Sequence, residues 1–100
     1  MPKQPALDAD EVAKRVAALD GWEVVDGKLH RELHFADFSE AFGFMTRVAL
    51  AAEKLDHHPD WSNSWNRVTV DIVNHDAGGI SAVCFDLATA VDRATGSASA

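Results

Sequence analysis

Apolar positions recur along the chain with two different periods, which together predict three helices and four strands. Apolar residues three or four apart, the helical spacing, occur over residues 9–19, from position 37 or 39 to 55, and after Ser81. Strands are predicted over residues 22–25, 28–35, 61–65 and 67–75. In the second and fourth of these segments apolar and polar residues alternate, which is typical of half-buried strands. The order α-β-β-α-β-β-α predicts an α+β domain, with a four-stranded antiparallel sheet and three helices packed on one face.

Local signals mark the ends of these elements. Asp8 followed by Glu11 is typical of a capping box at the start of the first helix. Asp26-Gly27 favours a two-residue hairpin turn, in which both positions need positive φ. Either Asp37 or Ser39 is suited to cap the second helix. The polar segments 56–60 and 76–79 are expected to be loops.

Composition narrows the class of protein. The 100 residues suffice for one domain, 1–100, of which about 6–93 are expected to be ordered between short flexible tails. A content of 47% hydrophobic and 25% charged residues is typical of a globular protein. The net charge of −7 argues against nucleic acid and anionic membrane surfaces as partners. The single cysteine favours a reducing compartment, and with no apolar leader segment visible we expect a cytoplasmic protein.

The second helix carries more apolar surface than one sheet face can cover. One stripe consists of Phe38, Phe42, Met45, Ala49 and Ala52, and an adjoining one of Phe44, Val48, Ala51 and Leu55. Together they cover about half of the helix circumference. The excess predicts a partner subunit, and so a homo-oligomer, either a dimer or a tetramer.

Histidines gather in the second half of the chain. His57 and His58 follow the second helix, and Pro59 restricts the pair. His75 ends the last predicted strand, where its ring is expected to reach the same cavity, and Asp56 is placed to accept a hydrogen bond from one ring. Imidazoles titrate near neutral pH, so this cluster favours general acid–base chemistry. Trp61 and Trp65 offer aromatic surface for a flat ligand.

Other interpretations of these residues were weighed against this one. The cluster together with Cys84 has the atom types of a zinc site, but its spacing fits no common zinc motif, so no metal is expected. His30 and His34 lie on the polar strand face and are interpreted as solvated. Trp22 is placed at the edge of the core, and Cys84 is interpreted as a buried, inert thiol.

The segment AFGFMTRVALAAEKLDHHPDW, followed by Trp65 and His75, resembles the pterin-4a-carbinolamine dehydratases. The motif is Glu, three residues, His-His-Pro, then an aromatic residue, then a histidine on the next strand. The resemblance extends from the first helix to about Asp92. It implies an enzyme that removes water from a 4a-hydroxytetrahydropterin to give the quinonoid dihydropterin in tetrahydrobiopterin recycling, without a metal or other cofactor.

The resemblance also implies roles for individual residues. His57 and His75 match histidines of proton transfer, while His58 matches one that positions substrate and shares that role. The substrate-binding set matches two chain segments and two pocket residues: Asp56, His57 and His58; Val73, Asn74, His75 and Asp76; and Glu53 and Trp61. The alternative is a non-catalytic module that binds a pterin or a protein through its oligomer surface.

One position departs from the family pattern. The last helix of the family opens with Ser or Thr, two residues and then Asp, whereas this chain has Ser81-Ala82-Val83-Cys84. The change predicts a lost reciprocal helix cap, worth about 1 kcal/mol. If the missing carboxylate oriented a histidine, lower activity would follow. Asp86 cannot replace it, because two residues turn a helix by about 200°.

Overall fold

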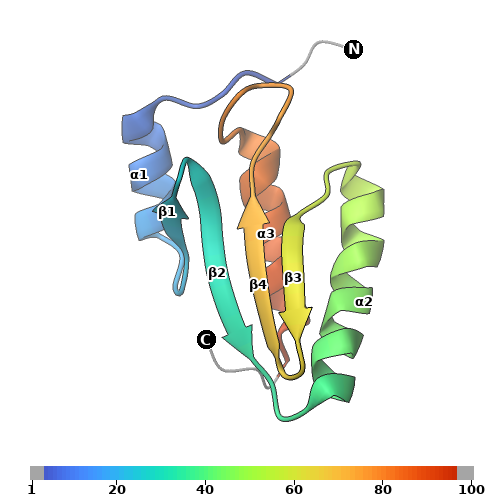
Figure 1. Cartoon of the computed structure of the whole chain (residues 1–100). Helices are drawn as coiled ribbons and strands as arrows, with labels where there is room; N and C mark the ends of the chain where they lie inside the picture. Colours follow the sequence, from blue (N-terminus) through green and yellow to red (C-terminus); the bar gives the residue numbers. More distant parts are fainter. Residues whose placement is uncertain (1–3, 97–100) are drawn as a thin grey trace.

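Two β-hairpins form one antiparallel sheet, with a helix before, between and after them (Figure 1). The computed structural model describes residues 4–96. In chain order the elements are α1 (Ala9–Ala17), β1 (Glu23–Val25), β2 (Lys28–His34), α2 (Phe38–Leu55), β3 (Asp60–Ser64), β4 (Arg67–Ile72) and α3 (Ala82–Ala94). The strand order β1-β2-β4-β3 makes β2 and β4 central. The predicted α+β class and element order are confirmed.

One face of the sheet is apolar because successive side chains of a strand point to opposite sides. Leu29 and Leu33 of β2 are fully buried and pair with Ile72 and Val68 of β4. Phe44 of α2 is the largest fully buried side chain in the described part of the chain. In Figure 1 α3 runs behind the sheet, and α2 packs beside α3. The core therefore lies between the sheet and its helices.

The turns and caps follow the sequence signals. Asp26 and Gly27 have φ values of 51° and 75°, as the predicted hairpin requires. The Asp8 carboxylate accepts a hydrogen bond from the Glu11 amide at 2.8 Å. Asp37, rather than Ser39, caps α2, since its carboxylate accepts the Glu40 amide at 2.8 Å.

Some predicted boundaries were wrong. Helix α1 ends at Ala17 rather than 19, because the next amides bond three residues back and tighten the last turn. Strand β4 ends at Ile72 rather than 75, because Asn74 leaves the sheet and pairs with Gly79. Strand β3 begins at Asp60, one residue earlier than predicted, and Trp65 belongs to the following turn with φ 49°.

The ends of the described chain are better anchored than predicted. The segment through Pro5 was predicted to fray, but the Gln4 side chain accepts a hydrogen bond from the Val83 amide at 2.9 Å. The Leu7 amide donates to the Ile80 carbonyl at 2.8 Å. At the other end α3 continues to Ala94, and the rest of the predicted flexible tails, residues 1–3 and 97–100, lies outside the described residues. No helix within residues 4–96 is long and apolar enough to cross a membrane.

The second face of the sheet is polar, and one of its two histidines differs from the prediction. His30 was interpreted as solvated, but its Nδ1 lies 2.8 Å from an Asp71 carboxylate oxygen and the side chain is only 26% exposed. Their strands pair directly, which brings the two side chains together. His34 is half exposed beside Glu32. Trp22 is buried as predicted, and its indole N–H donates to Asp92 at 2.8 Å.

Candidate active site

A cavity of about 250 Å³ opens at the end of the sheet where α2 leads into β3 and β4 leads toward α3 (Figure 1). Its lining comes from those two chain segments: Asp56, His57, His58 and Asp60 from one, and Val73, Asn74, His75 and Asp76 from the other. Two larger hollows, of about 350 and 370 Å³, are lined by residues of α2 and α3, by Phe35 after β2 and by the segment beyond α3, and neither lining includes a histidine. The smaller cavity is therefore the candidate site.

The direction of the first lining segment is set by the turn that ends α2. Asp56 adopts the left-handed conformation, with φ 51°. The His57 amide donates to the Ala52 carbonyl at 3.1 Å, and the Asp56 amide donates to the Glu53 carbonyl at 3.2 Å. This pair of bonds is a Schellman motif, which reverses the chain after a helix. The reversal places both adjacent histidines at the cavity.

The second lining segment is tied together by Asn74. Its amide N–H and carbonyl bond to Gly79 at 2.8 and 3.2 Å. Its side-chain amide donates to the Ser81 hydroxyl at 3.0 Å, and its side-chain oxygen accepts the Ala77 amide at 3.2 Å. These hydrogen bonds close a short loop that contains His75. They therefore fix the backbone from which the His75 ring projects.

The three predicted histidines meet at this cavity, each with a different partner. His58 Nε2 bonds to the Glu53 carboxylate at 2.5 Å, and His75 Nε2 bonds to the Asp60 carboxylate at 3.0 Å. His57 Nε2 lies 3.5 Å from the Cys84 sulfur. The site thus holds two exposed imidazole–carboxylate pairs and one more buried imidazole beside a thiol.

Burial distinguishes His57 from the other two rings. The main effect is desolvation, which lowers the pKa of His57 below its usual 6.5. A hydrogen bond with the Val73 backbone acts in the opposite direction, the neighbouring His58 and His75 lower the pKa further, and the charge of Asp56 raises it. His57 is therefore neutral at physiological pH.

One expected hydrogen-bond partner was wrong, and another partner was not predicted. Asp56 was expected to accept a hydrogen bond from a ring, but Glu53 and Asp60 supply the carboxylates, and Asp56 acts on His57 through its charge. The reason is that Asp56 serves as the left-handed residue ending α2. Asp60 was missed because it was assigned to the loop. The sequence did contain a signal for Asp60, because it directly precedes Trp61. Neighbouring side chains of a strand point to opposite faces of the sheet, so Asp60 lies on the face opposite Trp61.

Cys84 corrects a further expectation. The thiol is fully buried as predicted, but the reciprocal cap is not lost. The Ser81 amide donates to the Cys84 sulfur at 3.5 Å, so the thiol supplies the half of the capping box that the missing carboxylate would have supplied. Sulfur is a weak acceptor, yet its larger radius lets it contact the Ser81 amide and His57 together.

The two tryptophans lie apart from the cavity. Trp61 is partly buried against the core, on the helix-covered side of β3. Trp65 is 64% exposed in the turn between β3 and β4, at the opposite end of the hairpin from His57 (Figure 1). Within one chain, the flat surface expected from these rings is thus absent from the cavity wall. Among residues 4–96, no group of three His, Cys, Asp or Glu side chains is arranged to hold a metal ion.

The free energy of unfolding is expected to fall in mildly acidic solution, partly through His57. Because its pKa is lower in the folded protein, the unfolded chain takes up its proton first as the pH falls below 6.5. Stability is therefore lost between 6.5 and the lowered value, and a His57→Gln variant should lose less. Urea unfolding at about pH 7.5 and about pH 5.5 measures the difference. The control variant His34→Gln should lose as much stability between the two pH values as the wild type. If His57→Gln also loses as much as the wild type, the expectation is contradicted.

Comparison with known proteins places this geometry in a family. The family model described as pterin 4 alpha carbinolamine dehydratase matches residues 5–94. A relative from Solibacter usitatus that carries the name pterin-4-alpha-carbinolamine dehydratase is 52% identical over 86 residues, which are 86% of this chain and 90% of the relative. A relative of the same name from Rhodospirillum rubrum is 51% identical over 92% of this chain and 93% of its own length.

A solved structure gives the same result. The crystal structure of a transcriptional coactivator/pterin dehydratase from Brucella melitensis superposes with a TM-score of 0.86 at 42% identity. The match covers 90% of this chain and 98% of the other. The family model and both relatives cover nearly the full length of this chain, as does the solved structure. The chain therefore belongs to the pterin-4-alpha-carbinolamine dehydratase family.

Proposed function

We propose that this protein is a hydro-lyase that converts a 4a-hydroxytetrahydropterin to the quinonoid dihydropterin in tetrahydrobiopterin recycling. The observation that carries the proposal is the meeting of three imidazoles at one cavity. Their environments differ, since one ring is neutral through burial and two are exposed and paired with carboxylates. Imidazoles in unlike environments at one site suit acid–base catalysis, because one group must give a proton and another must accept one.

The reaction needs two proton transfers. One group gives a proton to the C4a hydroxyl, so that the C–O bond breaks and water leaves with the bond's electron pair. A second group accepts the proton of a ring nitrogen, and the freed electron pair forms the C=N bond. The net proton count on the enzyme is unchanged. We assign these transfers to His57 and His75, and to His58 the positioning of substrate together with a share in proton transfer.

The substrate would lie between the two lining segments. Asp56 and Asp76 provide acceptors for the amino and N–H groups of a pterin edge, and Val73 and Asn74 contribute the strand-end surface. Glu53 acts through His58, to which it is bonded. Trp61 packs beneath β3 and supports the segment that carries Asp60. The family resemblance implies no metal or other cofactor.

The purified protein tests the proposal directly. Generated 4a-hydroxytetrahydropterin dehydrates slowly by itself, and absorbance reports formation of the quinonoid product. We expect the protein to raise this rate well above the buffer rate and a His57→Ala variant to raise it much less. The proposal would be wrong if the dehydration rate with the protein equalled the spontaneous rate and the substitution did not change it.

We also propose that the chain forms a homo-oligomer through α2. Phe38, Phe42 and Leu50 are 49%, 54% and 69% exposed, and the rings of Phe38 and Phe42 lie 5.6 Å apart. Exposed aromatic side chains gathered on one helix are typical of a covered interface. Light scattering at tens of micromolar (about the range for a modest interface) should give a dimer or tetramer mass. A strictly monomeric mass would contradict this.

The same surface supports a second candidate role, a module that binds protein or pterin without turnover. The Brucella melitensis protein carries both names, transcriptional coactivator and pterin dehydratase. A protein that oligomerises but leaves the spontaneous rate unchanged would favour this role. We place either activity in the cytoplasm, because the single cysteine is a free, buried thiol.

A further inference from the structure

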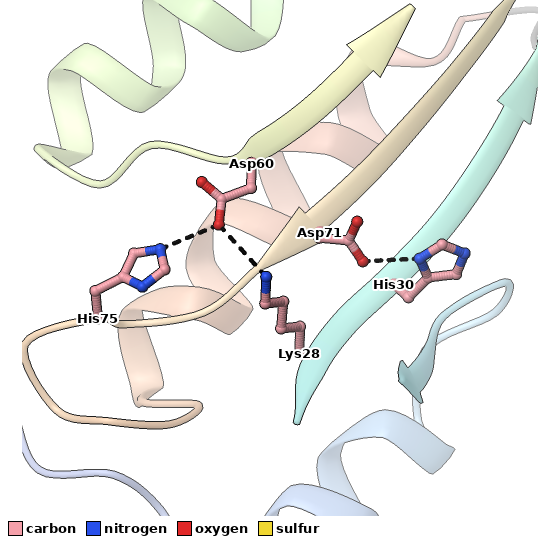
Figure 2. A network of polar contacts seen from close by, with 5 residues as sticks. All are labelled: Lys28, His30, Asp60, Asp71 and His75. Carbon is pink, nitrogen blue, oxygen red and sulfur yellow. Dashed lines mark hydrogen bonds and ion pairs between the residues drawn. The ribbon is translucent and has the colours of Figure 1, made fainter. Parts of the chain in front are cut away.

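Two histidine–aspartate pairs lie close together on the polar face of the sheet, and only one of them reaches the cavity (Figure 2). In the first, His75 Nε2 bonds to the Asp60 carboxylate at 3.0 Å. In the second, His30 Nδ1 bonds to the Asp71 carboxylate at 2.8 Å. Asp60 and Asp71 are direct partners across β3 and β4. The two pairs therefore offer a comparison within one protein.

The placement of Asp60 works against the stability of the sheet. Like charges directly opposite each other on neighbouring strands repel. Here the repulsion is offset by cations and imidazoles, since Lys28 Nζ lies 3.9 Å from the Asp60 carboxylate and His75 bonds to the same oxygen (Figure 2). A small polar residue would fit this exposed strand end without the repulsion. Packing therefore does not explain why a carboxylate stands at this position, whereas its hydrogen bond to His75 does.

We propose that Asp60 is the positioning residue of His75, holding the ring in the tautomer whose Nε2 carries the proton and leaving Nδ1 free for substrate. A carboxylate accepts hydrogen bonds, so neutral His75 can bond to it only through an Nε2–H group. The lone pair is then on Nδ1. This inference rests on the proposed role of His75 in proton transfer, and it names the reacting atom.

Other charged groups near His75 do not replace Asp60. Lys28 approaches from β2 and contacts the Asp60 carboxylate, Asp76 follows on the same loop, and His57 and Asp56 line the cavity from the other chain segment. His58 is held by Glu53. The His75–Asp60 pair is exposed, with the His75 side chain 72% accessible, so it adds little to folding. A bound substrate would exclude water and strengthen the contact.

Asp60→Asn is the decisive variant, and Asp71→Asn is its matched control. For Asp60→Asn we expect kcat to fall by about 10-fold to 100-fold, the range found when the carboxylate partner of a ligating histidine is removed. The KM should change little. The melting temperature should stay the same or rise, because the repulsion with Asp71 is gone. Asp71→Asn relieves the same repulsion, and it should keep wild-type kcat.

A spectroscopic measurement separates positioning from a structural effect. Nitrogen-15 NMR of the imidazoles at about pH 8, above the ordinary pKa of a histidine side chain, should show His75 as the Nε2–H tautomer. Asp60→Asn should raise the Nδ1–H form, since its amide can donate to Nε2, and Asp60→Glu should restore part of both tautomer and kcat. Full kcat with an unchanged tautomer in Asp60→Asn would overturn the inference. Inactive wild-type protein would refute the proposed function instead, while the tautomer spectra still report on Asp60.

Discussion

Replacing His75 by alanine is expected to lower kcat for pterin dehydration by about 10²-fold to 10⁴-fold, the usual contribution of a positioned general acid or base. The ring lies at the cavity, and its side chain is 72% exposed, so little packing is lost with it. The free energy of unfolding should therefore stay close to that of the wild type. Stopped-flow measurement of quinonoid product, together with urea unfolding of the same samples, gives both quantities.

His34→Ala is the control for this substitution. It removes an imidazole from the same polar face of the sheet, where His34 lies beside Glu32 and does not line the cavity. Its kcat should equal that of the wild type. A His75→Ala protein that turns over within about twofold of wild type would leave His57 and His58 to carry the reaction. A double variant with His57→Ala should lose less than the product of the single losses, because residues that act as a unit are not additive.

Replacing Phe44 by alanine is expected to have the largest effect on folding, a loss of about 3–5 kcal/mol in the free energy of unfolding. Phe44 is fully buried between α2 and the sheet, and its ring lies 4.9 Å from that of Phe35. Alanine removes this contact and leaves a cavity that close-packed neighbours fill only in part. Urea unfolding followed by tryptophan fluorescence measures the loss.

Phe42→Ala is the matched control, since it lies two residues away on the same helix and is 54% exposed in a single chain. In an isolated chain its loss should be below about 1 kcal/mol, as for most surface substitutions. In an oligomer that covers α2, its loss should grow with protein concentration, whereas that of Phe44→Ala should persist at all concentrations. Equal losses for the two variants in monomeric protein would contradict the assignment of the core face.

The sequence predicted most of the fold because its signals are local. Alternation along β2 places Leu29 and Leu33 on one face, and Asp26-Gly27 can form a tight turn without strain at glycine. Boundaries failed where a contact distant in sequence ends an element. Strand β4 stops at Ile72 because Asn74 bonds to Gly79 and Ser81 instead of to a neighbouring strand. The alternation of apolar and polar residues gives no sign of these bonds.

The sequence showed which residues of α2 are apolar, but it did not show which of them are buried in the core and which are exposed. The pattern marked about half of the helix surface as apolar, and the structure shows that Phe44 and Val48 face the core whereas Phe38 and Phe42 face outward. Periodicity alone cannot distinguish the two stripes, because each has helical spacing. The direction from which the sheet approaches decides which of them is buried.

For the site, the sequence by itself determined which imidazoles were expected to lie together. His57 and His58 were predicted to follow a helix end and His75 to end a strand, so three rings were expected at one cavity, and the structure brings them there. Only the tertiary structure decided what each ring bonds to. Asp60 reaches His75 from another strand end, and the Cys84 sulfur reaches His57 from the first turn of α3. Hydrogen bonds depend on distances of a few tenths of an ångström between segments far apart in the chain, and sequence spacing carries no such information.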